Sequence, residues 1–264
     1  MKPVVLLFIL FISNSLYAQT YSEWIEYSFQ YVDENRLDSA EIALQNALRT
    51  EPDNPLNAFL FHNMGTIQRR LSKNKEAFES YSLALRRHPN QPVFLADRAS
   101  LLSEMKQFQA ALADYSALLE IEPNNQEYLY QRGMTFLELK NQEQAEGDFQ
   151  KMLDLNPMSL YARLGLAALY KLQDRYNEAE KIYSYLESKE PNLPEIYAGH
   201  AEIYLLREKG SRALNEINKA IRLSEKENPY YYMIRSRAKL LLHEKESAAE
   251  DEKKAIELGY QQLE

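Results

Sequence analysis

The sequence contains no cysteine among its 264 residues. A chain without thiols can form neither a disulfide framework nor a thiolate metal site, and it has no cysteine to carry a lipid. It has only seven glycines, and they form no glycine-rich phosphate-binding loop. After Gln19 it also lacks an apolar run of the roughly 20 residues that a transmembrane helix requires. These absences argue against disulfide-stabilised, P-loop and membrane-spanning proteins.

Residue patterns typical of a catalytic site are also missing. The four histidines are His62, His88, His200 and His243, and the pair His243-Glu244 lacks the second histidine of a zinc-protease helix. Acidic pairs are plentiful, but on amphipathic helices they are usually the solvated face. We therefore expect no catalytic, cofactor-binding or metal-binding residues, and no enzymatic activity.

The beginning of the chain, 1–18, has the outline of a secretory signal peptide. Lys2 precedes an apolar stretch from Val4 to Ile12, and a short polar segment then leads to Ala18, a small residue suited to a cleavage site. Cleavage there also removes Lys2, which leaves 30 of the 31 basic residues against 39 acidic ones, a formal charge of −9. Nucleic acid is therefore an improbable partner. We expect a product without a transmembrane anchor that is exported to the periplasm or outside the cell.

The rest of the sequence is periodic, with one constant interval from Pro89 to Pro123, from Pro123 to Pro157 and from Pro157 to Pro191. Three other positions keep this interval. They are an alanine twelve positions before each proline, an aromatic residue four positions after that alanine, and a small residue twelve positions before that alanine. The four sets are Gly65, Ala77, Tyr81, Pro89; Ala99, Ala111, Tyr115, Pro123; Gly133, Ala145, Phe149, Pro157; and Ala167, Ala179, Tyr183, Pro191. Each set predicts two helices, with the small residues at their close contact, the aromatic filling the gap towards the next unit, and the proline ending the second helix.

This pattern resembles the tetratricopeptide repeat family, whose unit is a 34-residue helix-turn-helix with small residues, aromatics and a closing proline at these spacings. The resemblance implies an all-α fold, a right-handed α-solenoid of helix-turn-helix repeats. It covers nearly all of 19–264 and leaves no room for a separate catalytic domain. Such folds bind other proteins or peptides rather than catalyse reactions.

We expect about seven repeats. An early unit with Trp24 and Pro52 is separated from the next by a three-residue insertion, and the sixth has Glu225 where the closing proline belongs. The approximate ranges are 21–54, 58–91, 92–125, 126–159, 160–193, 194–227 and 229–260. The last unit needs a polar outer face, for which its final helix supplies Glu250, Asp251, Glu252, Lys253 and Lys254.

The binding surface is expected on the first helix of each unit. In the second repeat, Met64, Gly65 and Gln68 face the partner helix at helical spacing, so the residues between them face the groove. The same offsets along the chain also select small residues such as Gly165 and Gly199. The candidate groove residues are Phe59, His62, Asn63, Thr66, Asp97, Glu127, Tyr130, Gln131, Met134, Tyr161, Glu195 and Glu202.

Among them, Phe59, Tyr130, Met134 and Tyr161 are candidate anchors, and some of these could instead pack between units. With the acidic residues beside them, they predict a basic partner with apolar anchors. Cochaperone members of the family hold a terminal carboxylate with lysine, asparagine and arginine; here only Asn63 matches, and Asp97 stands where a base would be required. Two alternatives remain open: a groove for a glycan or another small ligand, and a self-assembling structural protein.

Overall fold

The computed structural model describes residues 19–260, and in that part of the chain every regular element is an α-helix. The predicted signal peptide, 1–18, lies outside the described residues. The helices are α1 (Tyr21–Asp33), α2 (Leu37–Thr50), α3 (Asn57–Arg70), α4 (Asn74–Arg87), α5 (Pro92–Glu104), α6 (Phe108–Ile121), α7 (Gln126–Glu138), α8 (Gln142–Leu155), α9 (Leu160–Leu172), α10 (Tyr176–Lys189), α11 (Pro194–Leu206), α12 (Gly210–Leu223), α13 (Pro229–Leu241) and α14 (Lys245–Glu257).

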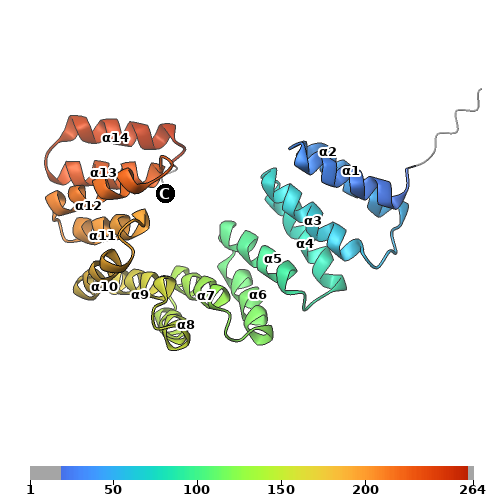
Figure 1. Ribbon diagram of the computed structural model, residues 1–264, viewed down its shortest axis with the longest axis horizontal. Coiled ribbons are helices and arrows are strands. Elements are labelled where there is room, and N and C mark those ends of the chain that lie inside the picture. The colour runs from blue at the N-terminus through green and yellow to red at the C-terminus, as the bar shows by residue number, and fades with distance from the viewer. Residues whose placement is uncertain (1–18, 261–264) are drawn as a thin grey trace, which may run out of the picture. The chain divides into compact units, whose positions relative to one another are not determined.

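Consecutive helices form antiparallel pairs joined by tight turns (Figure 1). One pair falls within each range expected from the repeat, with α3 beginning one residue earlier, at Asn57. The all-α, solenoid-type fold predicted from the spacing is confirmed. The chain forms two compact units, 1–101 and 102–264, and the boundary between them falls within α5.

The turn inside each pair has a left-handed residue that is never glycine. The residues with positive φ are Asn35, Ser72, Lys106, Lys140, Asp174, Glu208 and His243. Within each turn the following backbone N–H bonds back into the first helix, as Asn141 N does to Phe136 O at 2.8 Å. This geometry resembles the left-handed closure that ends many helices. Sequence pattern does not indicate this position, because it is normally recognised by glycine or asparagine and only Asn35 among these residues is either.

The periodic small and aromatic residues form the core. Ala77, Ala111, Ala145 and Ala179 are completely buried, and Tyr81, Tyr115, Phe149 and Tyr183 are at most 5% exposed. Their assignment to the core rather than to a ligand surface is confirmed. The aromatic rings occupy space that the glycines leave open: an ideal Cβ on Gly133 would lie 2.6 Å from Phe149 Cε1.

Two expectations about exposure are wrong. Gly165, expected in the groove, is buried against the Phe149 ring of the preceding pair, so it belongs to the contact between repeats. Asp251, expected on the polar outer face of the last helix, is 4% exposed and faces α13. The other polar residues of that segment, Glu250, Glu252, Lys253 and Lys254, are exposed or half-buried.

Candidate functional site

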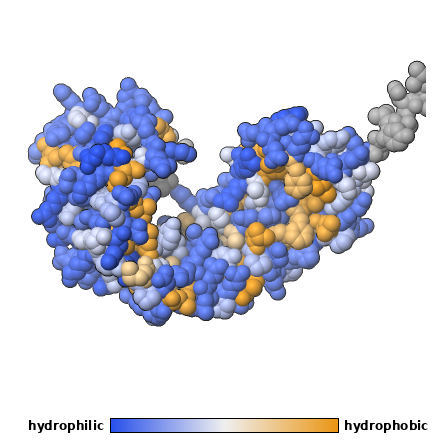
Figure 2. Space-filling view, in the orientation of Figure 1, coloured by the Kyte–Doolittle hydropathy of each residue, from blue (hydrophilic) through white to orange (hydrophobic). Residues whose placement is uncertain are grey.

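Three predicted residues of the first unit, Phe59, His62 and Asp97, gather around an aromatic cluster on α3 and α5. His62 Nε2 lies 2.6 Å from Asp97 Oδ2, and the His62 ring stacks on Phe94 with 4.7 Å between centroids. Phe59 is 42% exposed and contacts Phe94 edge-on. Asp97 is therefore already paired with an imidazole, and the apolar surface around it belongs largely to the first unit's own packing. Figure 2 shows hydrophobic residues gathered on this unit.

Asn63 and Thr66 line a small hollow of about 170 Å³ between α1, α2 and α3. Its walls are mostly apolar and include Phe29 and Val32, with Arg70 at the edge. One arginine and one asparagine provide less than the set of bases that a carboxylate clamp needs.

In the second unit, α7 and α9 form a cavity of about 360 Å³. Its lining residues are Gln126, Glu127, Tyr130, Gln131, Met152, Ser159 and Tyr161. The rings of Tyr130 and Tyr161 lie 5.3 Å apart, and burial together with Tyr161 raises the pKa of Tyr130. Among these lining residues, Glu127 is the one carboxylic acid. Four of the predicted residues, Glu127, Tyr130, Gln131 and Tyr161, are therefore brought together around one concave surface.

The two tyrosines differ in exposure. Tyr161 is 60% exposed, whereas Tyr130 is half-buried and packs against the hydrophobic core around Phe149. Met134 packs against the same core and does not line the cavity. Tyr161 is thus the side chain with the most surface to offer a ligand, Tyr130 forms the wall behind it, and Met134 belongs to the packing between units.

The structure does not place the other predicted acids at this cavity. Glu202 Oε2 lies 2.7 Å from Lys171 Nζ, and the pair bridges α11 and α9. Glu195 is exposed near Tyr231, where burial and then the charge of Glu195 raise the pKa of the phenol to about 12. Glu202 is therefore neutralised by Lys171 of the neighbouring repeat and adds no net negative charge to this surface.

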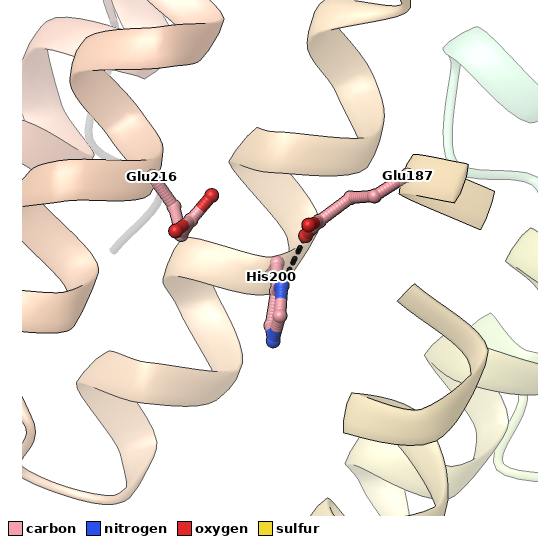
Figure 3. Close-up of side chains that lie close together, drawn as sticks. All are labelled: Glu187, His200 and Glu216. Carbon is pink, nitrogen blue, oxygen red and sulfur yellow. Dashed lines mark hydrogen bonds and ion pairs between the residues drawn. The ribbon is translucent and has the colours of Figure 1, made fainter. Parts of the chain in front are cut away.

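A buried polar cluster that the repeat spacing does not predict lies between α10, α11 and α12 (Figure 3). His200 is 4% exposed and its Nδ1 is bonded to Glu187, while Glu216 is ion-paired with Lys219 at 3.1 Å. His200 Nε2 is buried without a hydrogen-bond partner and points away from both carboxylates in Figure 3. Because the partnerless nitrogen does not face the acids and Glu216 is already neutralised, the cluster is better explained as a structural link than as a metal centre.

A further hollow was also missed. It has a volume of about 660 Å³ and is lined by residues near the ends of α9, α11 and α13, among them Leu172, Leu206 and Leu240. Successive leucines of this set are one repeat period apart, so the repeat spacing could have indicated that they lie on the same surface. Within residues 19–260, no helix is both long enough and apolar enough to cross a membrane.

Comparisons with known proteins agree with this architecture. Models of the tetratricopeptide repeat match residues 94–125 and 136–203. A crystal structure of a tetratricopeptide repeat protein from Parabacteroides merdae ATCC 43184 is 43% identical, with a TM-score of 0.86, over 92% of this chain and 94% of that one. A search of curated proteins found no match.

More distant structures share the fold. PilW, a widely conserved type IV pilus biogenesis factor, is 18% identical with a TM-score of 0.62, over 78% of this chain and 95% of that one. YrrB, a repeat protein with an unusual peptide-binding site, is 17% identical with a TM-score of 0.50, over 77% of this chain and 98% of that one. From the repeat spacing, the paired helices and the 43% identical relative, the chain belongs to the tetratricopeptide repeat family.

Proposed function

We propose that this protein is a non-catalytic scaffold that binds a polypeptide segment at the cavity between α7 and α9. One arrangement carries the proposal. The exposed Tyr161 lies beside a concave wall formed by Tyr130, and the carboxylate of Glu127 lies at the edge of that wall. Family membership supports it, because folds of this family are generally protein-interaction scaffolds. The peptide-binding site named for YrrB is a further, fold-level support.

The lining suggests which side chains the cavity accepts. Aromatic rings and Met152 favour a bulky apolar side chain, and tyrosine anchors lose little conformational entropy on binding. Glu127 favours a neighbouring lysine or arginine. The preferred ligand is therefore a segment with one apolar anchor beside a basic residue, a narrower proposal than a basic surface along the whole repeat array.

Replacing Tyr161 with alanine should weaken the binding of such a ligand by about 1–3 kcal/mol, mostly through faster dissociation, because the apolar side chain of the ligand loses its largest contact. Ligands are first selected from a displayed peptide library with the wild-type chain, and their rates are then measured by surface plasmon resonance. Tyr230→Ala is the matched control, since Tyr230 is exposed on α13, remote from this cavity. The proposal fails if the two variants bind selected peptides equally well.

Glu127→Lys should act differently. It should slow association and reduce its salt dependence, since charge at the rim steers encounter more than it holds the complex. Glu120→Lys, an exposed acid on α6, is the control for net charge. Soluble polysaccharides are titrated in parallel; saturable binding that depends on Tyr161, with no peptide selected, would favour a glycan site instead.

We also propose that the protein is exported after cleavage behind Ala18. The support is the order of a basic residue, an apolar segment and a small residue in 1–18. The intact mass of protein purified from its native host should correspond to a chain that begins at Gln19. A soluble pool that retains Met1 to Ala18 would contradict export.

A further inference from the structure

The turn between α8 and α9 carries a methionine that the repeat does not require (Figure 1). In three other repeats the residue directly after the closing proline is asparagine, at Asn90, Asn124 and Asn192, whereas Pro157 is followed by Met158. Asparagine suits a turn because its side chain bonds to nearby backbone groups. Since the other repeats form the same turn without a thioether, the architecture of the repeat does not explain Met158.

Met158 is the most accessible methionine of residues 19–260, with 62% of its surface exposed. Met105 and Met134 are half-buried. The remaining three are at most 8% exposed: Met64, Met152 and Met233. The sequence contains no cysteine, whose thiol would otherwise compete for an oxidant. Among the described residues, Met158 is therefore the sulfur that an oxidant in the surrounding solution reaches most easily.

The sulfur of Met158 already has a hydrogen-bond donor. The hydroxyl of Tyr185, on α10, donates to Met158 Sδ at 3.6 Å. A thioether is a weak acceptor, so this contact contributes little to stability. One repeat period before Tyr185 the residue is Lys151, whose Nζ donates instead to the Pro123 carbonyl at 2.6 Å. Met158 and Tyr185 thus depart from the repeat together, and the two departures meet in one contact.

Two cations lie over the ring of Tyr185. Arg163 Cζ is 4.7 Å from the ring centroid, and Lys189 Nζ is 5.9 Å from it. Arg163 also donates to the Ser159 carbonyl at 3.3 Å, which holds the guanidinium beside the turn that contains Met158. A sulfoxide oxygen carries a partial negative charge, which both cations attract. The surroundings of this sulfur therefore suit its oxidised form better than its reduced form.

We propose that Met158 is the site at which a hydroperoxide modifies this protein, and that the Tyr185 hydroxyl binds the resulting sulfoxide. A lone pair of the sulfur attacks the terminal oxygen of the peroxide, so that an S–O bond forms while the O–O bond breaks. The proton of the transferred oxygen goes to the leaving hydroxide or alkoxide, which departs as water or an alcohol. The sulfur loses two electrons and the peroxide gains them.

The product differs from the thioether in its hydrogen bonding. A sulfoxide is polar, and its oxygen accepts the hydrogen bond of Tyr185 more strongly than the sulfur does. Because Met158 is exposed and lies in a turn, oxidation there removes no side chain from the core. Met158 does not line the cavity at Tyr161, so this proposal and the proposed peptide binding can fail separately.

The site is tested with hydrogen peroxide on the purified protein, followed over time by peptide mass mapping. The peptide that contains Met158 should gain one oxygen atom at least about ten times faster than those that contain Met152 or Met233, because a buried sulfur reacts only when the structure opens locally. Met158→Asn is the matched variant, since it introduces the residue of the other repeats. It should remain folded and lose the fast reaction.

The role of Tyr185 is tested by removing its hydroxyl. Oxidation of Met158 should lower the melting temperature of Tyr185→Phe by about 2–4 °C more than that of the wild type, because phenylalanine cannot donate to the sulfoxide. The reduced forms should melt at nearly the same temperature. Tyr176→Phe is the control on the same helix, because the Tyr176 hydroxyl donates to Asp174 rather than to Met158. Its shift on oxidation should equal that of the wild type.

Three results would overturn the proposal. The first is oxidation of Met105 or Met134 as fast as that of Met158. The second is an equal shift on oxidation in Tyr185→Phe and the wild type, which would show an accessible sulfur that the phenol does not serve. The third is loss of the helical circular dichroism signal when Met158 alone is oxidised in the wild type, because a sulfoxide bound by Tyr185 leaves the helices intact.

Discussion

Replacing Gly133 with leucine should destabilise the second unit by about 3 kcal/mol or more. The Phe149 ring is completely buried and lies between Gly133 and Gly165, so a side chain on Gly133 has no room to enter. Its first carbon alone would come within 2.6 Å of the ring. At roughly 2–4 °C per kcal/mol for a chain of this size, the melting temperature should fall by about 10 °C.

Two further variants isolate the cause. Gly147→Ala adds a methyl group on α8 where nothing lies within 4 Å, so it should stabilise by about 0.5–1 kcal/mol through helix propensity. Phe149→Ala combined with Gly133→Leu should cost less than the sum of the single changes, because the leucine can use the vacated space. Additive effects in urea denaturation would show that the glycine and the ring do not oppose one another.

Replacing Arg235 with methionine should destabilise the last helix pair by about 2–3 kcal/mol, because it leaves a buried carboxylate with one cation fewer. Asp251 accepts hydrogen bonds from Arg235 Nε at 2.8 Å and Nη2 at 2.5 Å, and Lys239 Nζ lies 2.7 Å away. Lys253→Met is the control, since Lys253 is highly exposed and its contact with Glu257 is a loose 3.7 Å. Hydrogen exchange resolved along α13 and α14 measures the effect; equal protection in both variants would contradict it.

The same pair predicts a pH dependence. Burial alone would raise the pKa of Asp251, but hydrogen bonds from Arg235 and Lys239 outweigh burial and hold the pKa below its ordinary value of 3.8. A carboxylate with a depressed folded-state pKa contributes stability above its unfolded pKa and loses it as the pH falls through the folded one. Protection of α14 should therefore decline below about pH 4 in the wild type. In Asp251→Asn this decline should be smaller and stability at pH 7 lower.

Residues of the candidate site could be predicted where their position on one helix face decides whether they line the site. Gln131 and Glu127 follow from helical spacing within α7, and Tyr161 from the same offset one repeat later. Helical spacing alone could not give the pairing of Glu202 with Lys171 or of His62 with Asp97, because each pair joins two repeats. The side of a helix on which a side chain lies is determined within that helix, whereas the charged group with which it pairs depends on the neighbouring helix pair. The predicted acidic surface was overestimated for that reason.

The hollow at the ends of α9, α11 and α13 and the buried His200 show a similar division between what the sequence and the structure determine. Leu172, Leu206 and Leu240 stand at a constant spacing in the sequence, but only the structure shows that they stay exposed and line one hollow. His200 carries no motif. Its ring stacks on Tyr204 within α11 and on Tyr183 of α10, and the second contact depends on how the two helices pack.

By itself the sequence determined the family, the all-helical fold, the positions of the helices and the small and aromatic core residues. It could do so because the packing of a repeat is local and recurs in each successive repeat, so each set of residues reports the same contact. Tertiary structure alone decided which acids are neutralised, that Gly165 belongs to the contact between repeats, and that Asp251 is buried between α14 and α13. Those properties depend on distances between side chains from different helices, which the periodic spacing does not specify.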